Sequence, residues 1–183
     1  MNPIATLHMA NGRNIVIELL PESAPNTVNS FIYTASRGYL DHHAIERIVP
    51  GNWVDVSYTA FGKKECRYLI PNEFELNPDV VPLDSHPGAV CMGGYGEAGL
   101  AGCEFFFPLR DCPDHKGIYP VFGRVLEGMD ELYRLEKVET VPVTDFPIEG
   151  VEVNRPVKPE IIERVELELH GEIYPEPVRV REP

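Results

Sequence analysis

The chain has 183 residues, of which 43% are hydrophobic and 25% are charged, so we expect one globular domain with a sizeable core. Its formal net charge of −13 repels phosphate backbones and anionic surfaces, which argues against nucleic acids and membranes as partners. No signal peptide or membrane-spanning apolar run is visible. The four cysteines form no CxxC pair, and we expect a cytoplasmic protein with free buried thiols.

The first elements along the chain are a strand and an amphipathic helix. Residues 14–20 form an apolar run rich in β-branched side chains, which predicts a strand. Residues 25–37 predict a helix, because proline suits its first turn and Gly38 suits the left-handed position after its end. Its apolar side chains recur with a 3.6-residue period, at Val28, Phe31, Ile32 and Ala35.

Most of the remaining pattern is typical of short strands. We expect the aromatic run Phe105–Phe107 to point alternately to the two faces of a sheet. A second helix is predicted at about 128–138, and the proline-rich residues 59–88 are interpreted as loops. Strands are predicted at 44–49, 53–58, 88–92, 104–107, 121–125 and 162–169.

Many short strands and two helices favour a mainly β fold, a barrel with helices at its ends. We expect this domain to cover residues 1–171. Residues 139–160 are interpreted as a loop, and the proline-rich tail at 172–183 as extended or disordered.

Two patterns could hold a cofactor. Residues 94–99 match GxGxxG after a predicted strand, but a dinucleotide site needs a helix to begin within the motif, and a second strand follows here instead. A mobile loop is the interpretation that we favour. Metal ligands could come from residues 111–115 or from His42 and His43. Adjacent histidines on a strand point to opposite sides, and no second group has ligand spacing, so we expect no metal and no cofactor.

Cys103 is a candidate nucleophile, with His86 or His115 as its base. Nothing nearby in the sequence activates the thiol, and the neighbouring Glu104 would raise its pKa. We therefore expect Cys103 to be a small buried residue.

Arg47 lies within an apolar run that favours a β-strand and ends at Pro50-Gly51. An arginine in such a setting needs a partner. If the strands on either side of the turn pair, Asp55 could approach the guanidinium. The residues alone leave two alternatives open, a structural ion pair with Asp55 or a group aimed at a ligand beside Phe106.

Several ordered motifs between Asn11 and Leu169 together resemble the cyclophilin-type peptidyl-prolyl cis-trans isomerases. Residues 45–51 resemble the family's Phe-His-Arg-Val-Ile-Pro-Gly strand, and residues 102–106 resemble its Gly-Ser-Gln-Phe-Phe motif. The other matching segments are residues 15–31, 87–92, 121–125 and 127–129. The resemblance implies a closed eight-stranded antiparallel barrel capped by two α-helices, in a divergent, bacterial-like member.

The resemblance also implies a site on the outer face of the barrel. Arg47 stands at the family's catalytic arginine, Phe106 on the floor of its proline pocket, and Asp55 at the glutamine that steadies the arginine. Glu104 replaces a second glutamine. The implied substrate-binding residues are Asn52, Trp53, Gly93, Gly94, Glu104, His115 and Tyr119.

The activity implied is isomerisation of X–Pro bonds in peptides and unfolded protein segments, by a monomer. We expect reduced activity, because Asp55 and Glu104 would hold Arg47 by charge-assisted hydrogen bonds and the pocket has lost a phenylalanine. The alternative is a non-catalytic module that binds proline-containing or basic segments in the same groove.

Overall fold

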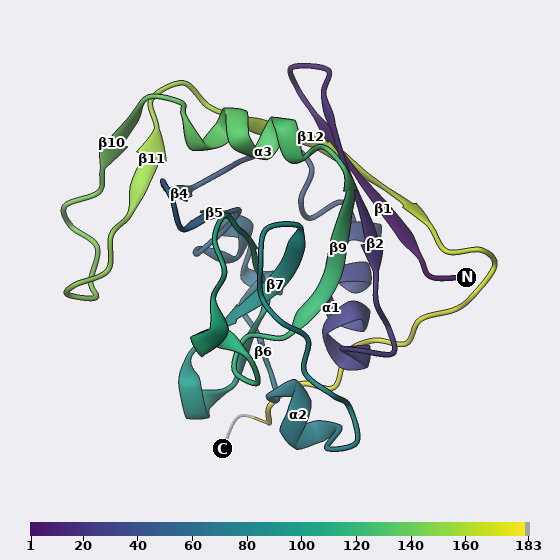
Figure 1. Ribbon diagram of the computed structural model, residues 1–183. Coiled ribbons are helices and arrows are strands. Elements are labelled where there is room, and N and C mark those ends of the chain that lie inside the picture. The colour runs from purple at the N-terminus through teal and green to yellow at the C-terminus, as the bar shows by residue number, and fades with distance from the viewer. Residues whose placement is uncertain (182–183) are drawn as a thin grey trace.

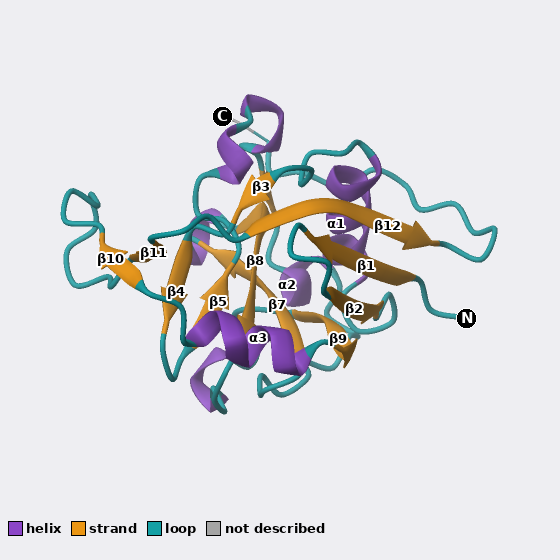
Figure 2. Cartoon of the chain, turned by 90° about the horizontal axis from the view of Figure 1, so that it is seen from above, coloured by secondary structure: helices purple, strands orange, loops and turns teal. Residues whose placement is uncertain are grey.

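The computed structural model describes residues 1–181 and is built around a curled antiparallel sheet (Figures 1 and 2). Within these residues the sheet has ten strands in the order β3-β12-β1-β2-β9-β7-β8-β5-β4, and β6 pairs with β8. A separate hairpin consists of β10 (Thr140–Pro142) and β11 (Asn154–Pro156). The strands of the sheet are β1 (Ile4–Met9), β2 (Asn14–Leu19), β3 (His43–Ala44), β4 (Arg47–Val49), β5 (Trp53–Asp55), β6 (Leu69–Ile70), β7 (Ala89–Gly94), β8 (Leu100–Pro108), β9 (Val121–Glu127) and β12 (Ile161–Glu168).

Three α-helices surround the sheet in the described part of the chain: α1 (Pro25–Ser36), α2 (Glu73–Leu76) and α3 (Met129–Glu136). In Figure 1, α3 lies at the top and α2 at the bottom. The helix α1 matches its prediction closely, and Gly38 after its end has φ +71°. No helix among residues 1–181 is long and apolar enough to cross a membrane.

The core fills the concave side of the sheet and contains the predicted apolar face of α1. Phe31 of α1 packs edge-on against Phe105 of β8, with ring centroids 5.3 Å apart. Phe105 and Phe107 point inward, and Phe106 points to the outer face, where it joins a small second cluster. The predicted alternation of the aromatic run is confirmed, and it places Phe106 on the outer face of the sheet, outside the main core.

The strands differ from the prediction in two ways: one expected strand is divided, and several others were missed. The predicted strand at 44–49 contains the end of β3, which pairs with β12, and all of β4, which pairs with β5. Between them the N–H of Ile45 donates to the carbonyl of Glu160 and that of Glu46 to Val56, so the chain passes from one partner strand to another. The sequence prediction missed β1 and β6, and it also missed the β10–β11 hairpin within residues 139–160.

The short helix α2 was also missed, since four residues are too few to show a helical period. Its Glu73 is fully buried and accepts hydrogen bonds from the backbone N–H and the hydroxyl of Thr27, both at 2.9 Å. This carboxylate thus caps the first turn of α1, whose own N-cap residue makes no side-chain bond.

The C-terminal tail is extended as far as the described residues reach and is docked on the domain. The side chain of Asn26 donates to the carbonyl of Val178 at 3.0 Å and accepts from its N–H at 2.7 Å. The N–H of Val180 donates to Leu69 at 2.8 Å, and the guanidinium of Arg179 lies 4.1 Å from the centre of the Tyr68 ring. The tail therefore joins α1 to β6, and residues 182–183 of the predicted tail lie outside the described part.

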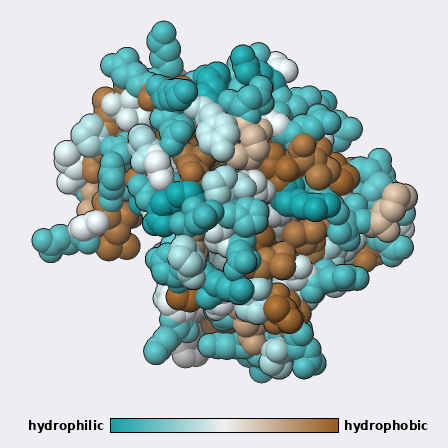
Figure 3. Space-filling model, in the orientation of Figure 1, coloured by the Kyte–Doolittle hydropathy of each residue, from teal (hydrophilic) through white to brown (hydrophobic). Residues whose placement is uncertain are grey.

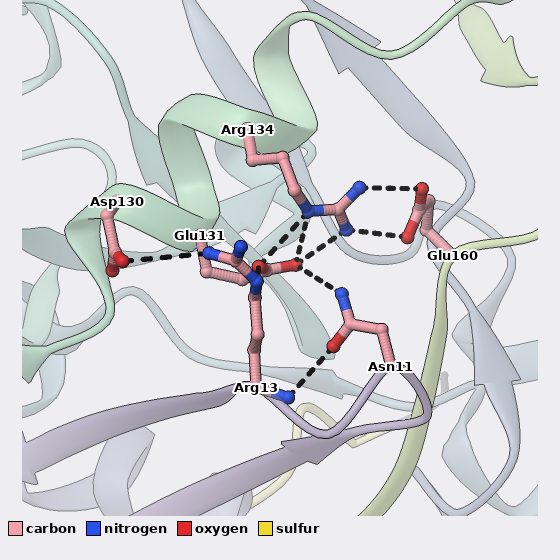
Figure 4. A network of polar contacts seen from close by, with 6 residues as sticks. All are labelled: Asn11, Arg13, Asp130, Glu131, Arg134 and Glu160. Atoms are coloured by element: carbon pink, nitrogen blue, oxygen red, sulfur yellow. Dashed lines mark hydrogen bonds and ion pairs between the residues drawn. The ribbon is translucent and has the colours of Figure 1, made fainter.

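A polar network fixes α3 against the strands (Figure 4). Glu131 of α3 is only 1% exposed and accepts from Arg134 at 2.6 Å and from Asn11 at 3.1 Å. Arg134 also donates to Glu160 at 2.7 Å, and Arg13 lies 3.4 Å from Glu131. A buried carboxylate with several charged and polar partners is well satisfied, so α3 is held to the β1–β2 turn and to the start of β12.

All four cysteines are buried and unpaired, as predicted. Cys103 is 2% exposed, and its thiol donates to the backbone carbonyl of Cys66. The neighbouring Cys66 thiol and burial raise the pKa of Cys103, so it is not an activated nucleophile. The glycine-rich motif at 94–99 contains one short 3₁₀ turn and then leads into β8, so no α-helix begins within it.

Candidate active site

Three residues of the proposed site form one row across neighbouring strands. Arg47 of β4 lies directly opposite Asp55 of β5, and Asp55 lies opposite Phe106 of β8. Side chains of directly opposed residues lie on the same face of a sheet. The row is therefore on the outer face, with Phe106, and the predicted approach of Asp55 to Arg47 is confirmed.

The register of this row is set by the turn between β4 and β5. Gly51 has φ +75°, which glycine adopts without strain. The N–H of Asn52 closes the turn on the carbonyl of Val49 at 2.9 Å, and the N–H of Gly51 donates to the Glu136 carboxylate of α3 at 2.7 Å. The helix thus fixes the turn that brings Arg47 and Asp55 together.

Next to the row lies a cavity of about 200 Å³. Among the predicted site residues only Asn52 does not line it, since its side chain accepts a hydrogen bond from Arg110. The lining residues are Arg47, Trp53, Asp55, Ser57, Gly93, Gly94, Glu104, Phe106, His115 and Tyr119.

The floor and one wall of the cavity are aromatic. Phe106 is 8% exposed and packs on the buried Cys91. Its ring centroid is 6.1 Å from that of Trp53 and 6.0 Å from those of His115 and Tyr119. Burial lowers the pKa of His115, so this ring is mainly neutral near pH 7. The result is an apolar recess beside a single guanidinium.

Two acceptors orient the guanidinium of Arg47. Nη1 donates to Oδ2 of Asp55 at 3.3 Å, and Nε donates to the backbone carbonyl of Glu152 at 2.7 Å. Among residues 1–181, Nη2 has no hydrogen-bond partner. The Arg47 side chain is only 14% exposed, and its Cζ lies 5.6 Å from the centre of the Trp53 ring. The arginine is therefore held in place and keeps donors for a ligand.

The two carboxyl groups of the groove differ in their relation to Arg47. Burial raises the pKa of Asp55 to about 7 against the opposing effect of Arg47, and the charges of Glu104 and Glu46 raise it further. Burial likewise raises the pKa of Glu104 to about 7, and its Oε2 accepts from the Tyr95 hydroxyl at 3.0 Å. Within the described chain, Glu104 makes no ion pair with Arg47, so of the two expected contacts only that of Asp55 is present.

Sequence reasoning missed two contributors to the site. Ser57 lines the cavity and follows Asp55 by two residues, so extending the strand alternation would have found it. Glu152 contributes its backbone carbonyl, which every residue type possesses, and no sequence pattern identifies such a contact. A second cavity of about 370 Å³ shares Glu104 with the first and is lined also by residues 58–60, 66–69, Tyr95 and Ala101.

A family model described as cyclophilin type peptidyl-prolyl cis-trans isomerase/CLD matches residues 4–175. The chain belongs to this family. It is 31% identical over 153 residues to peptidyl-prolyl cis-trans isomerase-like 1 of Gibberella zeae, covering 84% of this chain and 91% of that protein. It is 32% identical over 158 residues to CYP18-2, a peptidyl-prolyl cis-trans isomerase of Arabidopsis thaliana, covering 84% and 92%.

Longer proteins contain a similar domain. The chain is 30% identical over 152 residues to the mouse peptidylprolyl isomerase domain and WD repeat-containing protein 1, and this match covers 81% of the chain but only 23% of that protein. The chain thus spans about a quarter of that relative.

Solved cyclophilin structures share the fold. A cyclophilin-type isomerase of Cryptosporidium parvum, crystallised with the dipeptide Ala-Pro, gives a TM-score of 0.71 at 17% identity and covers 90% of this chain and 98% of its own. AquaCyp293, a cyclophilin from Hirschia baltica, gives 0.66 at 16% identity, covering 89% and 73%. These likenesses bear out the predicted mainly β, cyclophilin-like fold, with three helices among the described residues where two were expected.

Proposed function

We propose that this chain is a peptidyl-prolyl cis-trans isomerase whose catalytic group is Arg47. The observation that supports this most is the row of Arg47, Asp55 and Phe106 along a small cavity whose floor and one wall are aromatic. At about 200 Å³ the cavity is smaller than the roughly 300–1,000 Å³ of pockets for drug-sized ligands, and it suits one proline ring.

The chemistry needs one well-placed donor. Rotation about the X–Pro bond has a barrier of about 18–20 kcal/mol, because the twisted amide loses its resonance. In the twisted state the prolyl nitrogen becomes pyramidal and gains a lone pair. A guanidinium N–H of Arg47 that donates to this lone pair stabilises the transition state but not the planar ground states. The aromatic wall excludes water and strengthens this interaction.

The remaining lining residues would bind the peptide. Phe106, Trp53 and His115 would surround the proline ring, and the Tyr119 hydroxyl would donate to a peptide carbonyl. Gly93 and Gly94 lie at the end of β7, beyond its last pairing with β9 at Cys91, where a peptide backbone could pair instead. The second cavity beyond Glu104 offers room for a residue that flanks the proline.

We infer that proline-containing segments of unfolded proteins are the natural substrates, and that the protein acts as a cytoplasmic monomer in protein folding. The four free thiols support a reducing compartment. The net charge of −13 argues against nucleic acids and anionic membranes as partners.

Exchange NMR on an Ala-Pro peptide without a coupled protease tests the proposal. We expect faster cis–trans exchange with the wild-type protein and a loss of at least 100-fold in kcat/KM with Arg47→Ala. Binding of the peptide without any acceleration of exchange would instead identify a non-catalytic module and refute the proposed activity.

A further inference from the structure

The β10–β11 hairpin lies beside β4, although residues 139–160 were expected to be only a loop. It extends from the body next to β4 in Figure 1 and forms a separate lobe of mixed hydropathy in Figure 3. Its docked edge is β11, which contacts β4, together with the preceding Val153, which is 2% exposed. The hairpin is therefore anchored at one edge, next to the strand that carries Arg47.

Asn154 connects this edge to β4. Its Nδ2 donates to the backbone carbonyl of Ile48 at 3.1 Å, and also to Oε1 of Glu152 at 2.8 Å. Ile48 is the residue after Arg47 on β4. One amide thus fixes both the strand of the arginine and the residue whose carbonyl accepts from the arginine Nε at 2.7 Å.

The two acceptors of Arg47 have different properties. A guanidinium is planar, so contacts at Nε and at Nη1 together define the direction of the remaining N–H groups. The carboxylate of Asp55 loses its charge when it is protonated, whereas the backbone carbonyl of Glu152 can accept a hydrogen bond at any pH. The carbonyl contact is also the shorter one, 2.7 Å against 3.3 Å.

We propose that the β10–β11 hairpin is part of the isomerase site, and that Asn154 is a positioning residue that aims Arg47 through the carbonyl of Glu152. This inference rests on the proposed isomerase function. Asn154 does not line the cavity and needs no contact with substrate. Its removal should loosen the guanidinium and lower kcat, and it should leave KM nearly unchanged because the aromatic recess is intact.

The experiment compares Asn154→Ala with Arg155→Ala, an exposed neighbour on the same strand. We expect kcat on the Ala-Pro peptide to fall five- to tenfold for Asn154→Ala, with KM within twofold of wild type, and no change for Arg155→Ala. In an Arg47→Lys background, which lacks Nε, the Asn154→Ala change should alter the residual rate less than twofold. A fivefold loss in that background would overturn the inference, because Asn154 would then act elsewhere.

A second measurement does not depend on activity. The Nε–H resonance of Arg47, assigned by its loss in Arg47→Lys, should exchange slowly with solvent in the wild-type protein and at least tenfold faster in Asn154→Ala. Equal exchange in the two proteins would overturn the positioning role. If the wild-type protein fails to accelerate peptide exchange while this difference is present, the proposed isomerase function fails and the contact of the hairpin with Arg47 is retained.

Discussion

Replacement of Asp55 by glutamine tests what an ionised carboxylate does to Arg47, the proposed catalytic group. Oδ2 of Asp55 lies 3.3 Å from Nη1 of Arg47, and burial raises the pKa of Asp55 to about 7. The carboxyl group is thus mainly neutral in mildly acidic solution and ionised above pH 7. Glutamine, the residue found here in the family pattern, is uncharged at every pH. The variant therefore separates orientation of Arg47 from neutralisation of its charge.

The size of the effect follows from Coulomb's law. A carboxylate at about 7 Å from a full negative charge on the prolyl nitrogen would repel it by ~2.4 kcal/mol at an effective dielectric constant of about 20. If about a third of a charge develops in the transition state, the cost is ~0.8 kcal/mol, or roughly fourfold in rate. Glu104, whose pKa burial also raises to about 7, adds an effect of the same sign.

The assay is exchange NMR on the Ala-Pro peptide between pH 5.5 and 8.5. We expect wild-type kcat/KM to fall four- to tenfold as the pH rises, and Asp55→Gln to be about fourfold more active than wild type at pH 8.5. Glu97→Gln removes an exposed acid of the neighbouring loop and is the control for net charge. If Asp55→Gln is slower than wild type at pH 8.5, the carboxylate mainly orients Arg47 and the electrostatic reasoning is wrong.

Three further predictions concern Arg47, the two acids of the groove and the docked tail. Arg47→Lys keeps the charge but loses the planar fork, so kcat/KM in the exchange assay should fall at least tenfold, with a melting temperature close to that of wild type. Because the pKa values of Asp55 and Glu104 are raised in the folded state, the unfolded state releases these protons at lower pH than the folded state does. These two groups therefore lower the free energy of unfolding as the pH rises from about 4 to about 7. In urea unfolding, the free energy of unfolding should fall less between pH 5 and pH 8 for the double variant Asp55→Asn/Glu104→Gln than for wild type. Asn26→Ala leaves the backbone groups of Val178 without their partner, and urea unfolding should show a loss of about 1–3 kcal/mol; an unchanged midpoint would mean that the docked tail adds nothing to stability.

Long periodic segments were predictable from the sequence, and short or divided ones were not. The helix α1 has an apolar face, a proline at its start and Gly38 after its end, so its bounds could be predicted to within a residue. The strand at 44–49 looked continuous because no glycine or proline interrupts it. Its division into β3 and β4 depends on backbone bonds from Ile45 and Glu46 to distant segments, which local sequence does not encode.

The side chains of the site were largely predictable, because family motifs placed Arg47, Asp55 and Phe106 and strand pairing then aligned them. The backbone contact from Glu152 was not, since a carbonyl group leaves no trace in the sequence. The expected contact between Glu104 and Arg47 was inferred from proximity alone. In the structure the Tyr95 hydroxyl donates to Glu104 instead, which turns one of the two acids away from the arginine.

A site that depends on one hydrogen-bond donor needs that donor to be held firmly in position. The hydrogen bond that the donor makes in the transition state weakens steeply as its distance and angle change. Arg47 is fixed within its own row by Asp55 and from the hairpin by Glu152. Both ends of its strand are also tied down: the N–H of Ile45 donates to the carbonyl of Glu160, and the N–H of Gly51 donates to Glu136. Glu160 directly precedes β12 and Glu136 ends α3, the two elements that the network of Figure 4 joins. The buried network around Glu131 therefore also holds in place the segments that tie down the strand of Arg47.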